Sequence, residues 1–180
     1  MFEGMRVKFG RKRPVALGPH FRFNNYLSLS RLPTPPPSAD YSRPAADTLS
    51  DVMGNDTLGD CVIAAGYHML GVETANAGRP FHASLAQVIG DYSTIAGYVP
   101  GDSSTDNGTD EIAALNYWAS HGFANGDKLI GWAALDSTNE AEVQAAAWLF
   151  ENVFLCLELP NTFVTPFPSG NGFLWGDGAT

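Results

Sequence analysis

Cys61 is the residue whose surroundings point most directly to chemistry. It stands where a glycine-spaced loop, residues 54–60, meets an apolar run that is typical of a helix. A thiol in the first turn of a helix lies among unpaired backbone N–H groups and at the positive end of the helix dipole, so its thiolate form is favoured. The position therefore predicts a nucleophile. The alternative is that Cys61 is a small core residue, as most free cysteines are.

A nucleophilic thiol needs a general base within hydrogen-bond reach, and none of the four histidines is placed for that role. His68 lies further along the same expected helix, roughly 10 Å away by helical rise. His20 belongs to the N-terminal segment, while His82 and His121 lie at expected helix boundaries. We therefore expect the general base to be missing from this chain.

The composition fits one folded domain of ordinary size. The chain has 180 residues, of which 44% are hydrophobic, and this is enough for a single core. No stretch of about 18 apolar residues is present, so no membrane span is expected. The basic N-terminus lacks the apolar block of a secretory signal, which predicts a cytoplasmic protein. Two cysteines, Cys61 and Cys156, are too few for a disulfide framework, although a single bridge stays an alternative.

Positive and negative charges are separated along the chain. Residues 1–44 carry a net charge of +6 and residues 45–180 one of −15, which together give the −9 of the whole chain. The proline-rich run 32–37 predicts an extended segment, so we divide the chain into a basic, extended arm (1–44) and a globular domain (45–180). Such an arm can fold back on its own domain, clamp a second copy or another protein, or reach a polyanion. The acidic domain should repel nucleic acid, which stays an alternative for the arm alone.

Helical periodicity and capping residues predict most of the secondary structure of the domain. Four helices are expected, over 60–77, 84–92, 110–121 and 139–150. Two strands are expected over 128–134 and 153–159, and the apolar character of the second predicts burial on both faces, Cys156 included. The polar loop 98–108 matches a calcium-binding loop poorly, and the chain has neither a phosphate loop nor paired His/Cys ligand spacing. We therefore expect no metal and no cofactor.

The motif around Cys61 resembles that of the papain-like cysteine peptidases. Asn55 lies six residues before Cys61, a glycine lies two residues before it, and the helix is expected to begin at the cysteine. The chain is similar to a group of uncharacterised papain-like proteins from bacteria and their phages in the sequence Asn-Asp-Thr-Leu-Gly-Asp-Cys and in the runs 97–102 and 115–118. The resemblance covers roughly residues 50–160.

The resemblance implies an α+β fold, mainly the helical lobe of a papain-like domain with a few strands of its sheet lobe. It implies that Cys61 is the nucleophile and that Asn55 supplies the side-chain donor of the oxyanion hole. Asn55 stands in place of a glutamine, Asp60 in place of a small residue and Val62 in place of an aromatic one. Asp60 is expected to raise the pKa of the neighbouring thiol and so to oppose the helix effect.

Two functions follow as expectations. In the first, the chain is a papain-like cysteine peptidase-related protein, truncated at its C-terminus and not catalytically competent as a 180-residue chain. It would be an active hydrolase only if a histidine and an Asn or Asp followed residue 180. In the second, it is a phage virion structural or interaction protein, associated with the capsid or tail rather than the cytoplasm. In both, the arm reaches protein partners or further copies of the chain.

Overall fold

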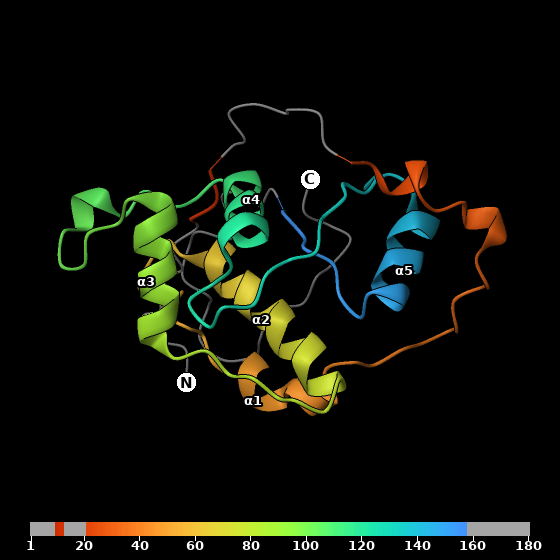
Figure 1. The fold of residues 1–180 in the computed structure, drawn as a ribbon, viewed down its shortest axis with the longest axis horizontal. Coiled ribbons are helices and arrows are strands. Elements are labelled where there is room, and N and C mark those ends of the chain that lie inside the picture. The colour runs from red at the N-terminus through yellow and green to blue at the C-terminus, as the bar shows by residue number, and fades with distance from the viewer. Residues whose placement is uncertain (1–9, 13–20, 158–180) are drawn as a thin grey trace, which may run out of the picture.

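The computed structural model describes residues 10–12 and 21–157, and in this part the chain is built from helices and connecting loops (Figure 1). The α-helices are α1 (Ala46–Leu49), α2 (Cys61–Asn76), α3 (Leu85–Ala96), α4 (Glu111–His121) and α5 (Glu140–Leu149). Short 3-10 helices are η1 (Phe23–Asn25), η2 (Leu29–Arg31), η3 (Arg43–Ala45) and η4 (Ser103–Thr105). None of the described helices is long and apolar enough to cross a membrane.

The four helices predicted from the sequence are confirmed, with ends that shift by a few residues. Local capping explains three of the starts. Ser84 forms a capping box with Gln87 at α3, the carboxylate of Asp110 accepts two amides at α4, and Asn139 accepts the Glu142 amide at α5. Helix α3 runs four residues further than predicted and ends at Gly97, whose φ of 74° is the left-handed conformation that terminates helices.

Helix α2 is the centre of the core, and it is buried along most of its circumference. Ile63 and Tyr67 are fully buried, and η3, α1, α3 and α4 all pack against the helix. The Tyr67 hydroxyl donates to Asp91 of α3, 2.5 Å away. The rings of Trp118 and Phe123 stack with 4.4 Å between centroids on the α4 side. A helix without a solvent face of its own is thus held by neighbours on several sides.

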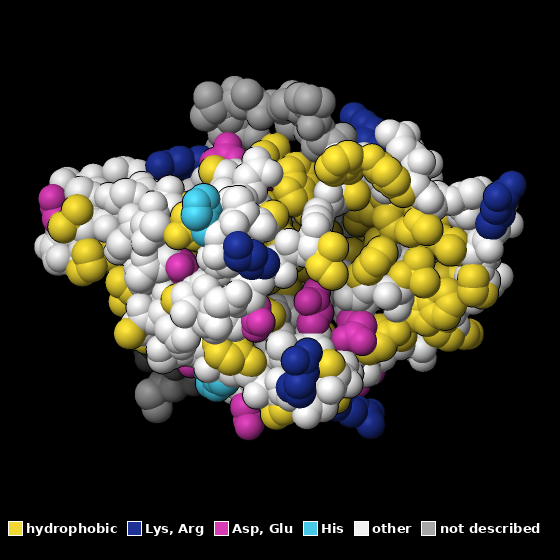
Figure 2. Space-filling view, in the orientation of Figure 1, with side chains coloured by type: hydrophobic (Ala, Val, Ile, Leu, Met, Phe, Trp, Pro, Cys, Tyr) yellow, Lys and Arg dark blue, Asp and Glu magenta, His cyan; other side chains and the backbone are white. Residues whose placement is uncertain are grey.

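Helix α5 and residues 21–31 lie to one side of this core (Figure 1). The pairing of Arg22 with Ala134 joins residues 21–31 to the loop before α5, with the Phe23 amide donating to the Ala134 carbonyl at 3.0 Å. Phe23 packs edge-on against Phe150. Apolar side chains gather on this side of the surface (Figure 2), and Phe21, at 62% exposure, is one of them.

Both predicted strands are wrong within the described residues. Within 128–134, residue 134 alone takes part in β pairing, through the isolated bridge between Ala134 and Arg22. Leu155 and Leu157 are 63% and 61% exposed rather than buried on both faces, and Cys156 is exposed as well. Residues 158 and 159 lie outside the described part. An apolar run becomes a strand only when a second strand satisfies its backbone, and no described segment runs alongside 153–157 as such a partner.

The predicted α+β papain-like fold is therefore wrong as well. The described part of the chain has no sheet, and its only β pairings are the isolated bridges Arg11–Thr109 and Arg22–Ala134. The strands expected of the sheet lobe are absent from residues 10–12 and 21–157, where the regular elements are helices.

Two glycines inside helices provide a matched test of this packing. A Cβ on Gly66 of α2 would lie 2.9 Å from two ring atoms of Phe123, whereas a Cβ on Gly90 of α3 would meet nothing within 4 Å. The Phe123 ring is held between Trp118 and Tyr67, so it has little room to move. Gly66→Ala should lower the free energy of unfolding by about 1 kcal/mol or more. Gly90→Ala should raise it by about 0.5–1 kcal/mol.

Urea unfolding followed by circular dichroism measures both variants against the parent chain. Equal effects in the two variants would contradict the close approach of Phe123 to α2.

Candidate functional site

The helix that carries Cys61 begins at that residue, as the sequence predicts. The Asp60 carbonyl accepts the amides of Ile63 and Ala64, at 2.8 and 3.0 Å, while the Asp60 side chain makes no capping bond. The preceding loop turns at Gly54, whose φ of 90° suits glycine. The Cys61 thiol is half-buried at the end of this loop.

A short piece of the arm lies directly on this helix start. The backbone amide of Gly10 lies near the sulfur of Cys61. The Gly10 carbonyl accepts the Thr109 amide at 2.7 Å, and the Lys12 amide donates to the Thr109 carbonyl at 2.9 Å. Together these bonds form a parallel bridge centred on Arg11 and Thr109. The arm therefore folds back on its own domain, which is one of the three arrangements expected from its charge.

Arg11 fixes this segment through a paired ionic contact. Its Nη2 and Nε atoms donate to the two carboxylate oxygens of Glu111, at 2.7 and 3.2 Å. The Glu111 side chain is only 12% exposed. The Arg11 guanidinium also lies close enough to Cys156 for its charge to act on that thiol, so that both cysteines of the chain lie near residues 10–12. We call Gly59, Cys61, Gly108, Thr109 and Glu111, which surround residues 10–12, the arm site.

Three glycines meet at the arm site. A Cβ on Gly10 would overlap the carbonyl of Gly59, and a Cβ on Gly108 would overlap the carbonyl of Gly10. Gly108 in addition has a φ of 75°. The arm backbone thus passes between two loops at a separation that side chains would prevent.

Tyr92 of α3 holds the two loops of the arm site in place. Its hydroxyl donates to the Asp106 carboxylate at 2.6 Å and accepts the Gly108 amide at 2.9 Å. The same Asp106 oxygen accepts the Gly59 amide at 2.9 Å. Burial and this bond to Asp106 raise the pKa of Tyr92, so the hydroxyl stays protonated and keeps donating.

The electrostatics around Cys61 oppose thiolate formation. Burial is the main cause that raises the thiol pKa, the charge of Asp60 adds to it, and the amides of Gly10 and Val62 act in the opposite direction. Together these effects raise the pKa of the Cys61 thiol, whereas its position at a helix start alone predicts a lowered pKa. Cys61 as nucleophile stays a prediction.

Asp60 is itself an unusual group. It is fully buried, and apart from its own backbone amide neither carboxyl oxygen has a hydrogen-bond partner in the described part of the chain. Burial, with the charges of Asp106 and Asp56, raises its pKa to about 7. Near neutral pH the acid is therefore held partly in its neutral form.

Asn55 is the other predicted site residue. The Asn55 side-chain oxygen is buried without a partner among the described residues, and no hydrogen bond joins it to Cys61 there. Its role in an oxyanion hole stays a prediction.

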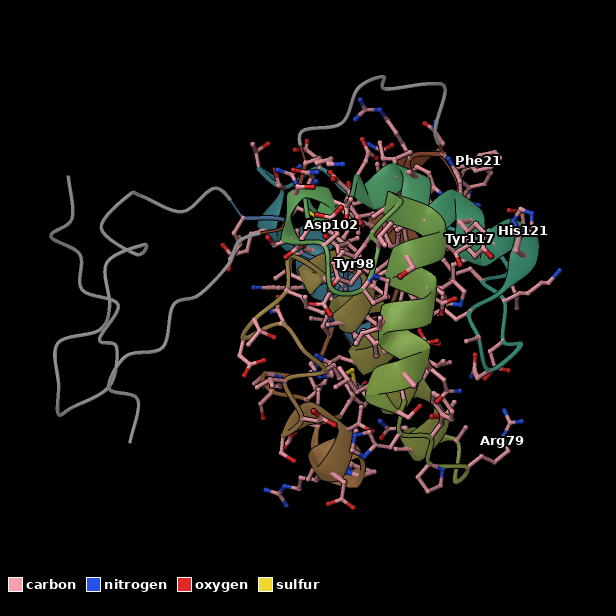
Figure 3. The ribbon with its side chains drawn as sticks, turned by 90° about the vertical axis from the view of Figure 1, so that its left-hand side faces the viewer. Phe21, Arg79, Tyr98, Asp102, Tyr117 and His121 are labelled. Carbon is pink, nitrogen blue, oxygen red and sulfur yellow. The ribbon has the colours of Figure 1, made fainter. Side chains whose placement is uncertain are left out.

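The described histidines lie elsewhere. His68 bonds to the Asp51 carbonyl and His82 to the Asp51 carboxylate, both at 2.9 Å. His121 stacks on Tyr117 at the end of α4 (Figure 3). None of these three bonds to Cys61, and the fourth histidine is outside the described residues.

Sequence reasoning missed most of the arm site. Gly10, Thr109 and Glu111 were not singled out as site residues, and only the charge difference between arm and domain pointed toward their contact. Comparison with protein-family models, curated proteins and solved structures gave no match for this chain. The resemblance to cysteine peptidases therefore rests on the sequence alone, on the motif of residues 55–61 with the runs 97–102 and 115–118, and stays a prediction.

The raised pKa of Asp60 predicts a pH-dependent stability. Between about pH 4 and 7 the folded chain keeps a proton that the unfolded chain has lost, so the unfolding free energy should fall as pH rises, by about 1.4 kcal/mol per pH unit. Above pH 7 Asp60 is ionised in the folded chain as well, so the free energy of unfolding should fall no further through this group. Asp60→Asn should remove this fall and should be more stable than the parent at pH 8.

Urea titrations at pH 5, 6, 7 and 8 measure the effect. Asp102→Asn, at an exposed loop position (Figure 3), serves as the control and should retain the parent slope over this range. An unchanged slope in Asp60→Asn would contradict the assignment to Asp60.

Proposed function

We infer that this chain is a relative of cysteine peptidases that is not catalytically competent and that works as a protein-interaction module. The relationship is supported by the Asn55–Cys61 spacing and by a helix that begins at the cysteine. Here the start of α2 serves to hold an extended basic segment rather than to cleave one.

The observation that carries this proposal is the contact between Gly10 and Cys61. The arm backbone is bonded to Thr109 beside the helix start, and the Gly10 amide lies near the sulfur that a substrate carbonyl carbon would have to approach. Peptide cleavage needs that approach for a carbonyl carbon and needs a base for the thiol proton. In the described part of the chain, the arm lies near the sulfur and no histidine bonds to the thiol.

The charges also support a binding role. The domain is strongly acidic and the arm strongly basic, and the one described ion pair between them, Arg11 with Glu111, is two-pronged and largely shielded on the Glu111 side. Such pairs select a partner by geometry as well as charge. The narrower prediction of a capsid- or tail-associated virion protein shares this use of the arm and stays a prediction.

Thiol reactivity tests the lack of competence. In a Cys156→Ser chain only Cys61 can react with iodoacetamide, and its rate should still be rising above pH 9, because the thiol pKa is raised from the ordinary value of 9.0. The same chain should not hydrolyse fluorogenic peptides. Cys61→Ser, which leaves only the exposed Cys156, gives the reference rate.

A rate for Cys61 that is already maximal at pH 7 would overturn the proposal. So would peptide hydrolysis that disappears in Cys61→Ser.

A further inference from the structure

We propose that the arm site is a binding site for extended peptides in which a glycine is followed by an arginine, and that residues 10–12 are a built-in copy of this ligand. The proposal rests on the interaction role inferred above and specifies its partner. That partner is another protein that presents the same motif and displaces the arm.

The walls of the arm site are held by the domain and do not depend on the arm. Gly59 and Gly108 are joined through the buried carboxylate of Asp106 and the buried hydroxyl of Tyr92. Both residues belong to the domain, and their hydrogen bonds to these loops do not involve residues 10–12. A site that exists before its ligand arrives binds without the cost of ordering its walls.

The first selectivity is for glycine. The Cβ of any other residue at the position of Gly10 would overlap the Gly59 carbonyl, which is backbone and has no rotamer to move away. Even from the opposite side, a Cβ on Gly59 would lie 3.3 Å from the Gly10 Cα and 2.9 Å from the Asp106 carboxylate. This position therefore accepts glycine and rejects alanine.

The second selectivity is for arginine at the next position. The two parallel bonds from Arg11 to the Glu111 carboxylate use the planar fork of a guanidinium, which a lysine does not have. The Glu111 side chain is only 12% exposed, so this ion pair is largely shielded from water on the carboxylate side. The backbone bonds to Thr109 then set an extended conformation without regard to other side chains.

The built-in copy favours a foreign partner over a second copy of the chain. An arm on the same chain competes at a high effective concentration, because it is covalently tied to the domain. The identical arm of a second copy gains no contact that could offset this advantage. A different protein that presents the motif and makes additional contacts with the domain can offset this advantage.

The test uses the full-length chain with Gly10→Val, which should release the arm and leave the walls intact. Trypsin should then cleave after Arg11 and Lys12 faster than in the parent. A fluorescent peptide with the sequence of residues 7–13 should bind Gly10→Val at least about tenfold more tightly than the parent, because the parent's own arm competes. Arg11→Ala, which weakens the arm without crowding the glycines, provides a second released chain and should behave in the same direction.

Matched controls test each selectivity by fluorescence anisotropy. A peptide with alanine for its glycine should show no binding to Gly10→Val, and one with lysine for the arginine next to its glycine should bind about tenfold more weakly. Adding Glu111→Gln to Gly10→Val should weaken the binding of the unchanged peptide, with the sequence of residues 7–13, to a similar degree. Glu140→Gln, at an exposed position of α5, should change nothing.

Three results would overturn the proposal. One is a natively folded, trypsin-sensitive Gly10→Val or Arg11→Ala chain that does not bind the peptide. The second is equal binding of the glycine and alanine peptides. The third is a dimer of parent and Gly10→Val chains in size-exclusion chromatography, which would assign the site to a second copy. Cleavage of the bound peptide would instead overturn the lack of catalytic competence and leave the Gly-Arg selectivity supported.

Discussion

The burial of α2 is the constraint on which the rest of the structure depends. The helix is buried along most of its circumference, so several neighbours must cover it, and η3, α1, α3 and α4 all pack against it. Because α3 and α4 are fixed in this way, the loops between them and before α2 are brought together. The arm site lies where these loops meet.

The polar groups of the interior are concentrated on the same elements. Asp91 accepts bonds from Tyr67 and from the Ala124 amide, and Asp106 accepts bonds from Tyr92 and Gly59. Each of these buried carboxylates joins a helix to a loop, which makes the position of the loop specific. Asp60 differs, since its carboxyl oxygens accept no bond from another described residue, and it is the group whose protonation changes near neutral pH.

This arrangement gives the cysteine at the helix start a different meaning from the one that its position suggests. A helix N-terminus favours a thiolate when the thiol is open to solvent or paired with a base. Here burial and an adjacent carboxyl group act against the thiolate, and the amides near the sulfur belong to the arm and to the helix start. The same features that prepare a nucleophile in one setting form an acceptor for a peptide amide in another.

The sequence by itself determined the helices and the separation of charge. Helical periodicity and capping act within a few residues of one another, so the helices could be recognised without the fold, to within a few residues at their ends. The start of α2 at Cys61 was predicted for the same reason.

Only the tertiary structure decided whether apolar runs became strands and where the arm lies. The run from residue 153 has the composition of a strand, but pairing depends on a second segment distant in sequence, and none lies alongside its described part. The contact of Gly10 with Gly59 and Gly108 joins residues about 50 and 100 positions apart. Such contacts depend on the packing of α2, α3 and α4, and no local pattern encodes them.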